Sequence, residues 1–160
     1  MAGDDADRIA MRDSAGPRLE ILAASFARLA GRPLVAVSHG GLEQALWQAP
    51  RAIVAHGTEP EPLFFYGNRV ALDLFAMTPA AFIGLPSHRS AEPALREARA
   101  RMLAGLERSG IVDGYAGVRI AADGRRFGIA GAILWNLIDE LGRRHGQAAS
   151  FAEWRFLDAR

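Results

Sequence analysis

The sequence predicts one α+β domain in which short helices precede an antiparallel β-sheet. The last third of the chain reads as three strands, covering 115–120, 126–138 and 146–156, and the turns between them contain Asp123-Gly124 and Leu141-Gly142. A glycine turn between apolar runs favours a hairpin, because glycine accepts the positive φ of tight turns. The earlier stretches instead carry apolar residues at helical spacing or in short runs.

The N-terminal part is expected to contain a disordered terminus and then two helices. Residues 1–17 are polar and acidic, so we expect them to be disordered, and we assign 18–160 to a single domain that includes the N-terminal helices. From Arg18 to Leu29 the apolar residues recur at spacings of three and four, which predicts an amphipathic helix. Its stripe consists of Leu19, Leu22, Phe26 and Leu29. A shorter helix is predicted over 41–47.

Two short strands and two short helices follow. Apolar runs at 52–55 and 63–66 predict strands, and the prolines of the loop 57–62 prevent regular pairing within that loop. Asn68 is expected to begin the next helix, because its side-chain oxygen can accept a hydrogen bond from a free helix N–H. Thr78-Pro79 begins a further helical turn, with threonine as N-cap and proline at the first helical position.

The longest helix is predicted from Ser90 to Arg108, where Leu95, Met102 and Leu106 form one stripe. Gly110 ends this helix, and the three C-terminal strands follow it.

Composition excludes several classes of function. The net charge is +1, with 19 basic and 18 acidic residues, so no nucleic-acid or membrane partner is expected. The chain has no cysteine, which excludes disulfides, thiol catalysis and thiolate metal sites. The first 17 residues do not resemble a signal peptide, and no apolar run is long enough to span a membrane, so we expect a cytoplasmic protein. All basic residues are arginine, which we attribute to a GC-rich bacterial genome.

No arrangement of residues predicts catalysis or a metal site. The four histidines, His39, His56, His88 and His145, do not have the spacing of metal ligands. There is no nucleophile elbow, no phosphate-binding glycine loop and no pair of carboxylates suited to acid–base chemistry. The sequence therefore favours a protein that is not an enzyme. A small enzyme that uses His88 or Arg89 near Trp135 is the third alternative.

The best candidate for a ligand site is Trp135-Asn136, on the long strand 126–138. Trp135 is either a core residue or part of a ligand site. In the second interpretation, Trp135 or Asn136 lines a cavity beneath the helices, depending on which face of the strand meets them. Tyr115 and Gln147, on the flanking strands, would add polar contacts. From the long helix, the pocket would be closed by Leu95 and Met102, which an ordinary core explains equally well. Apolar pockets with a few polar groups bind small ligands.

The order of the elements resembles the PAS fold, a five-stranded antiparallel sheet with short helices over one face. Segments 64–68 and 77–84 and the two hairpin turns carry this likeness. A narrower set resembles the MEKHLA domain family, a PAS-like group, over residues 18–156: Leu85-Pro-Ser, Ser90-Ala-Glu-Pro, Tyr115-Ala-Gly-Val-Arg-Ile, Gly124-Arg-Arg-Phe, Trp135-Asn-Leu-Ile-Asp and Gly146-Gln-Ala-Ala.

The resemblance implies a sensory or regulatory module that binds a small, largely apolar ligand. The family brings no established reaction or ligand, so the cofactor is unknown. His88 lies where haem-binding PAS domains can supply an axial histidine, and a surface or helix-cap role is the alternative reading. The N-terminal helix 18–29 either covers the sheet or forms a homodimer, as such helices do in PAS-like proteins. A protein-interaction module without a ligand is the second hypothesis for the whole chain.

Overall fold

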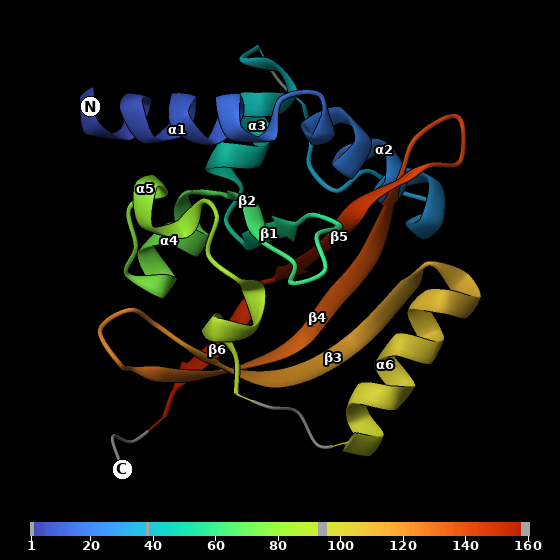
Figure 1. Cartoon of the computed structure of the whole chain (residues 1–160). Coiled ribbons are helices and arrows are strands. Elements are labelled where there is room, and N and C mark those ends of the chain that lie inside the picture. Colours follow the sequence, from blue (N-terminus) through green and yellow to red (C-terminus); the bar gives the residue numbers. More distant parts are fainter. Residues whose placement is uncertain (1, 38, 93–95, 158–160) are drawn as a thin grey trace.

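The structure is a computed structural model that describes residues 2–37, 39–92 and 96–157 (Figure 1). Its elements are α1 (Ala2–Ala15), α2 (Arg18–Ala30), α3 (Gly41–Gln48), β1 (Ala52–His56), β2 (Phe64–Gly67), α4 (Arg69–Phe75), α5 (Pro79–Phe82), the 3-10 helix η1 (Ser87–Ser90), α6 (Arg96–Ser109), β3 (Ile111–Ile120), β4 (Arg126–Ile138), β5 (Arg144–Phe151) and β6 (Glu153–Phe156).

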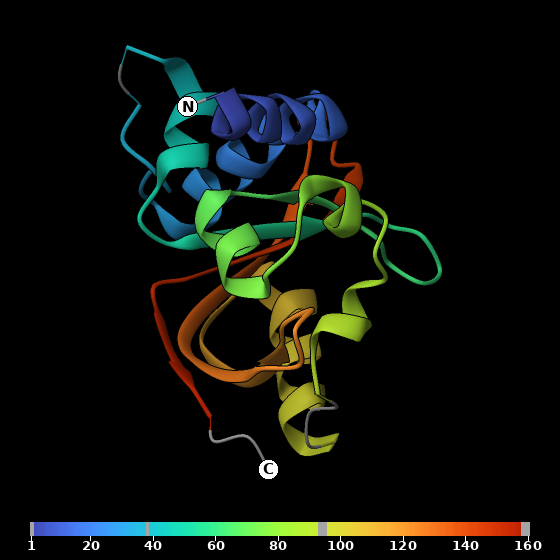
Figure 2. The same cartoon turned by 90° about the vertical axis from the view of Figure 1, so that its left-hand side faces the viewer.

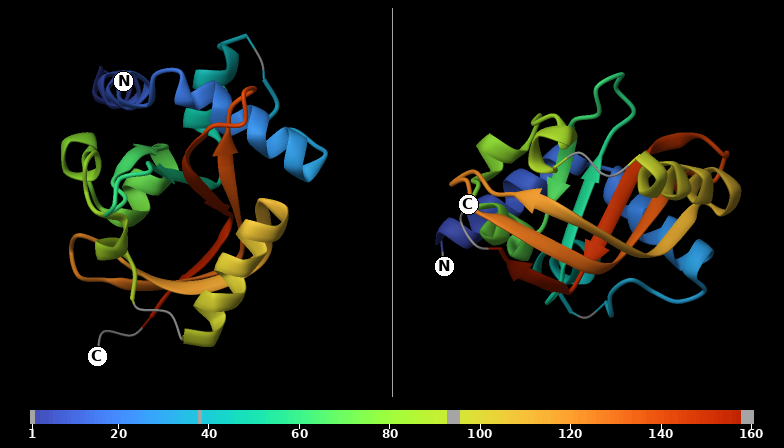
Figure 3. Two further views of the ribbon diagram at one scale, coloured as in Figure 1. Left: turned by 45° about the vertical axis from the view of Figure 1, so that its right-hand side comes forward. Right: turned by 90° about the horizontal axis from the view of Figure 1, so that it is seen from below.

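The strands form one antiparallel sheet in the order β2-β1-β5-β4-β3, with β6 also paired to β4. The right-hand panel of Figure 3 shows the strands side by side. The predicted C-terminal meander is confirmed, and β4 covers the residues expected for the long strand. The last predicted strand is divided into β5 and β6, both of which pair with β4.

Helices cover both faces of the sheet. Residues that pair across antiparallel strands point to the same side, and one such row consists of Gly67, Val54, Ala149 and Leu134. A Cβ on Gly67 would lie 2.8 Å from the ring of Phe82 in α5. Asn136, two residues beyond Leu134, donates to a carbonyl of α6. We call this side, which faces α5 and α6, the inner face.

The opposite side, the outer face, is covered by α2. Trp135 lies there and donates its indole N–H to the carbonyl of Leu22, at 3.1 Å, while the ring of Phe26 meets it edge to face. Ser25 accepts from the backbone N–H of Ile138 and donates to its carbonyl. Figures 1 and 2 show α1, α2 and α3 at one end of the molecule and α6 at the other.

The apolar stripe predicted for α2 is buried within the chain. Leu19, Leu22 and Phe26 are at most 5% exposed. Of the two roles expected for this helix, the structure shows that it covers the sheet, and a homodimer through it stays a prediction.

A bulge in β4 changes which of its side chains share a face. Ile129 pairs with Gly117 and Ala132 with Tyr115, so β4 contains one residue more than β3 in this interval. Gly131 lies in it with a φ of 63°, which glycine adopts without strain. Simple alternation groups Phe127 with Trp135, but Phe127 packs on Phe75 of α4, whereas Trp135 faces α2.

Residues 2–15, which we expected to be disordered, form helix α1. Met11 and Ala15, one helical turn apart, are at most 1% exposed, and Ser14 donates to the carbonyl of Phe65 in β2. The expectation was wrong because these few tertiary contacts outweigh a polar and acidic composition.

The predicted helix 90–108 is shorter in the structure, where α6 begins at Arg96 and η1 ends at Ser90. The N–H of Glu92, which follows η1, donates to the carbonyl of Val118 and holds Glu92 against β3. Leu95 lies outside the described residues.

Asn68 joins four parts of the chain through one fully buried carboxamide. Its oxygen accepts from the N–H groups of Ala71 in α4 and Ile53 in β1, at 3.1 and 3.0 Å. Its NH2 group donates to the carbonyls of Leu46 in α3 and Arg51, at 3.0 and 2.8 Å. The predicted N-cap is confirmed.

We predict that Asn68→Ala lowers the free energy of unfolding by about 3–5 kcal/mol, because it removes four hydrogen bonds and leaves buried backbone groups unpaired. Urea unfolding followed by circular dichroism measures the change. Gln48→Ala, at an exposed site on α3, is the control and is expected to be near neutral. Equal stability of the two variants would contradict the role assigned to Asn68.

At Gly146, β5 passes close to the end of β1. Its φ is 144°, and a Cβ there would collide with the carbonyl oxygen of His56. Gly142 also has a positive φ, 81°, but its surroundings are open.

Gly146→Ala is therefore expected to lower the free energy of unfolding by ~3 kcal/mol more than Gly142→Ala, whose cost is ~1–2 kcal/mol from backbone conformation alone. Thermal and urea unfolding of both variants give the comparison. Similar losses would show that the close approach to His56 carries no cost.

Candidate functional site

Two carboxamide side chains meet on the inner face beside the C-terminal end of α6. Asn136 donates from Nδ2 to the carbonyl of Leu106, at 3.1 Å. Gln147, its cross-strand partner on β5, donates from Nε2 to Asn136 Oδ1, at 3.3 Å. Both residues are half-buried. Each amide keeps a second N–H that these hydrogen bonds do not use, so the pair can still donate to a ligand.

His56 extends this pair into a row across three strands, because it pairs with Gln147 on the other side of β5. Burial lowers the pKa of His56 below its ordinary value of 6.5, so the imidazole is neutral at pH 7. Its Nδ1 lies 3.0 Å from the carbonyl of Gly57, which can only accept, so we assign the proton to Nδ1. Nε2 is then an acceptor. We call His56, Gln147 and Asn136 the polar row.

Sequence reasoning had not selected His56 as a site residue. It had considered this histidine only as a metal ligand, and the register that places it beside Gln147 is not visible in local sequence patterns.

Tyr115 and Arg119 lie further along β3 on the inner face. A Cβ on Gly117, between them, would be 3.2 Å from the ring of Tyr115 and 3.5 Å from an Arg119 nitrogen, so both side chains lean over this glycine. Burial lowers the pKa of Arg119. Met102, on α6, is half-buried and packs against the hydrophobic core. The structure therefore places Tyr115, Asn136, Gln147 and Met102 on the side of the sheet that α6 covers.

Two other predicted residues lie elsewhere. Trp135 is 0% exposed, bonded to α2 on the outer face, so the core interpretation describes it. His88 is on the surface, in η1, with its Nε2 3.5 Å from a carboxylate oxygen of Glu61. Both side chains of this pair are more than half exposed. A further predicted residue, Leu95, lies outside the described part of the chain.

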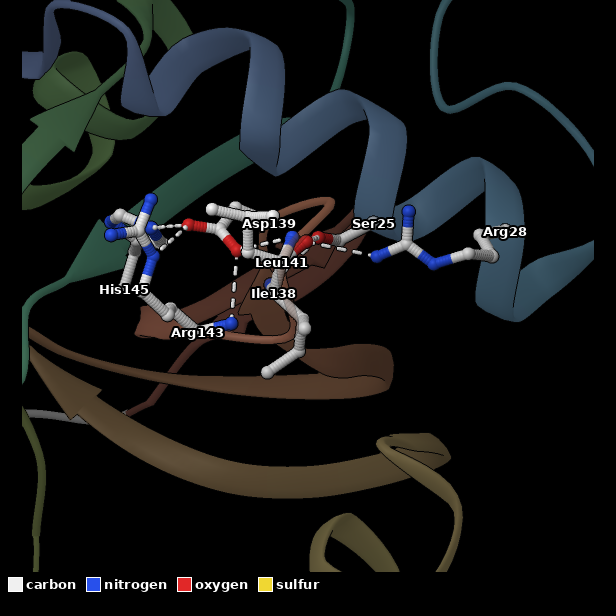
Figure 4. Close-up of polar contacts among 7 residues, drawn as sticks. All are labelled: Ser25, Arg28, Ile138, Asp139, Leu141, Arg143 and His145. Carbon is white, nitrogen blue, oxygen red and sulfur yellow. Dashed lines mark hydrogen bonds and ion pairs between the residues drawn. The ribbon is translucent and has the colours of Figure 1, made fainter.

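A separate polar cluster closes the turn between β4 and β5 (Figure 4). The carboxylate of Asp139 accepts from the N–H groups of Leu141 and Arg143, from Arg143 Nε at 3.0 Å and from His145 Nε2 at 2.8 Å. The hydrogen bond from His145 and those from Arg143 and Leu141 hold the pKa of Asp139 well below its usual range. Next to it, Arg28 of α2 donates to the carbonyl of Ile138. The Asp139 hydrogen bonds order the turn, and the contacts of α2 with Ile138 attach it to that helix, so we assign the cluster a structural role.

Two surface hollows lie away from the polar row. One, of about 410 Å³, is lined by Asp4, Asp7, Trp47, Arg69, Leu72 and Asp73. The other, of about 400 Å³, is lined by Ala30, Arg32, Ile111, Asp113 and Ile133. The predicted site residues that the structure describes line neither hollow.

Within residues 2–37, 39–92 and 96–157, no three His, Asp or Glu side chains are grouped so that they could hold a metal ion. In the same part of the chain, no helix has both the length and the apolar character needed to cross a bilayer.

Comparisons with known proteins agree on family and fold. The model of the MEKHLA domain family matches residues 17–156. Homeobox-leucine zipper protein HOX10 of rice, Oryza sativa subsp. indica and subsp. japonica, is 27% identical over 130 residues. The match covers 79% of this chain but 16% of HOX10, so the chain spans a small part of that relative.

Solved structures with the same fold have low sequence identity. The PAS domain of a protein from Colwellia psychrerythraea has a TM-score of 0.57 at 17% identity, covering 71% of this chain and 92% of that chain. The Light-Oxygen-Voltage domain of the blue-light photoreceptor Aureochrome1 has a TM-score of 0.55 at 16% identity, covering 75% and 87%. The light-state dimer of the fungal photoreceptor Vivid has a TM-score of 0.57 at 14% identity, covering 81% and 92%. These likenesses confirm the PAS fold.

The Asp139 cluster generates a prediction about pH. Folding lowers the pKa of Asp139 from its unfolded-state value, near 3.8. Its carboxylate therefore stabilises the fold fully at pH values above 3.8, and this stabilisation is lost as the pH falls toward the folded-state pKa. Wild type is expected to be more stable than Asp139→Asn at pH 7, and the difference should shrink steadily as the pH falls below about 4. Urea unfolding across this range tests it, with Asp73→Asn, at an exposed site on α4, as control. A difference that grows on acidification would contradict the assignment.

Proposed function

The chain belongs to the MEKHLA domain family, and on that premise we propose that it is a sensory or regulatory module that binds a small, largely apolar ligand without catalysing a reaction. The observation that carries the proposal is the polar row on the inner face. Three neighbouring strands supply half-buried hydrogen-bonding groups there, at the end of α6.

The chemistry of the row indicates the kind of ligand. Amide N–H groups donate, and the neutral ring of His56 accepts at Nε2, so the ligand would carry a polar edge with both acceptors and donors. The inner face around the row is apolar, with Leu106 2% exposed and Leu134 8% exposed, which suits a largely apolar body. Without cysteine, this chain has no thiol for a covalent bond to the ligand.

A regulatory module transmits binding through contacts with another chain, and a homodimer is the simplest such arrangement. We include homodimerisation through the N-terminal helices in the proposal. The light-state dimer of Vivid is a dimer of this fold, which supports the proposal without establishing it.

A second candidate is an interaction module without a ligand. Trp154 and Phe156 favour it, because they are 36% and 42% exposed on the short strand β6. Exposed aromatic residues are common at the centre of protein interfaces. Trp154→Ser would then abolish partner binding and leave ligand content unchanged, whereas Gln147→Leu would do the reverse under the leading proposal.

We predict that Gln147→Leu retains about tenfold less ligand than wild type, because the loss of one or two hydrogen bonds costs about 1–1.5 kcal/mol of binding free energy. Native mass spectrometry of protein purified from its own cells measures the retained ligand. Gln48→Leu makes the same change on the exposed surface of α3 and is expected to match wild type. A ligand-free wild type, or equal retention in both variants, would argue against ligand binding at the row.

A further inference from the structure

The interface beneath α1 contains buried polar atoms without hydrogen-bond partners. In the part of the chain that the structure describes, these side-chain atoms are Arg8 Nε, Glu43 Oε2 and Tyr66 OH. They come from α1, α3 and β2 in turn. Arg8 Nη1 donates to Glu43 Oε1, and burial together with the nearby carboxylate of Glu43 raises the pKa of Tyr66. The unpaired buried side-chain atoms of the described residues thus lie where α1 docks.

The same interface nevertheless holds α1 with specific contacts. Arg8 Nη1 lies 2.5 Å from a carboxylate oxygen of Glu43, and the indole N–H of Trp47 donates to Asp4. Met11 is fully buried. The docking surface on α3 and β2 therefore selects this helix by shape and charge.

Unpaired buried groups weaken this docking. Arg8, Glu43 and Tyr66 would each regain hydrogen bonds with water if α1 left the surface, which offsets part of the apolar contact that release loses. We therefore expect α1 to open before the rest of the fold, as weakly held terminal elements do. Helix α2 contacts Trp135 from its own position, whereas α1 adds Met11 and Ala15 to the core.

The position of α1 in the sequence indicates that it is separate from the family domain that follows it. The family match begins at residue 17, whereas α1 ends at Ala15. Its docking surface, on α3 and β2, lies inside the matched region. Only Gly16-Pro17 connects α1 to α2. Short hinges of this kind favour exchange of the terminal element between copies.

We propose that α1 is exchanged between two copies of the chain, so that each α1 docks on α3 and β2 of the other copy. The occupant is a second copy because the surface already fits α1, and an identical helix repeats every contact, including Arg8 with Glu43. Only the path of Gly16-Pro17 differs between the closed monomer and the exchanged dimer. This inference rests on the homodimerisation proposed above and names its surface.

Charge reversal tests the exchange. In Arg8→Glu, two carboxylates oppose each other when α1 docks in its own chain, and in Glu43→Arg two guanidinium groups do. In a 1:1 mixture, exchange pairs the carboxylate introduced at position 8 of the first variant with the guanidinium introduced at position 43 of the second. The other interface of the same dimer pairs the native Arg8 with the native Glu43. Analytical ultracentrifugation of each variant, the mixture and the double variant Arg8→Glu/Glu43→Arg gives the populations of monomer and dimer.

We expect heterodimer to predominate in the mixture, because the closed monomers and the homodimers of both single variants all retain a repulsive pair. We expect wild-type behaviour of the double variant. Wild-type dimer without preferential heterodimer formation in the mixture would overturn the exchange and leave homodimerisation standing. Wild type that stays monomeric at all concentrations would overturn both.

A second measurement covers the case in which a single variant does not fold. The chain has no cysteine, so a single introduced cysteine can be labelled specifically. One pool of protein carries a donor dye on Asp5→Cys in α1, and a second pool carries an acceptor dye on Gln48→Cys in α3. Arg8 and Glu43 are unchanged in both pools. Exchange places the donor helix of one pool on the acceptor surface of the other. We therefore expect energy transfer to appear on mixing and to be abolished by an excess of unlabelled wild type. Absence of transfer between the two pools overturns the proposal.

Discussion

The carboxamide of Asn68 is the interaction on which the arrangement of this domain depends. It binds the end of α3, the start of β1 and the first turn of α4 at once, with all four of its hydrogen-bonding positions used. Because it is fully buried, each of these backbone groups would otherwise be desolvated without a partner. The amide thereby sets where β2 gives way to α4, and so where the inner face begins.

The two faces of the sheet have different tasks, and β4 serves both. Trp135 and Ser25 attach the outer face to α2 through hydrogen bonds to backbone groups, which makes α2 part of the core. Asn136, the next residue after Trp135, points to the inner face and α6. The stripe of α2 is buried within the chain, and the exchange proposed above would place the contact with a second copy on α1.

The inner face carries an aromatic cluster and the polar row side by side. Large aromatic side chains, Phe64, Phe75, Phe82 and Phe127, pack together at the end of the sheet near α4 and α5. The polar row borders this cluster, because His56 pairs with Phe64, and its three residues are half-buried and keep free hydrogen-bonding positions. The ligand binding proposed above would use this row beside the aromatic cluster.

The sequence by itself determined the features that local chemistry encodes: the N-caps at Asn68 and Thr78, the turns at Gly124 and Gly142, the long strand 126–138, and the motifs of the family. Only the tertiary structure decided which side chains share a face. Strand register places His56 beside Gln147, the bulge at Gly131 separates Phe127 from Trp135, and a few buried contacts order α1 despite its polar composition. The physical reason is that register, bulges and docking are set by contacts between residues far apart in the chain, which patterns of neighbouring residues do not contain.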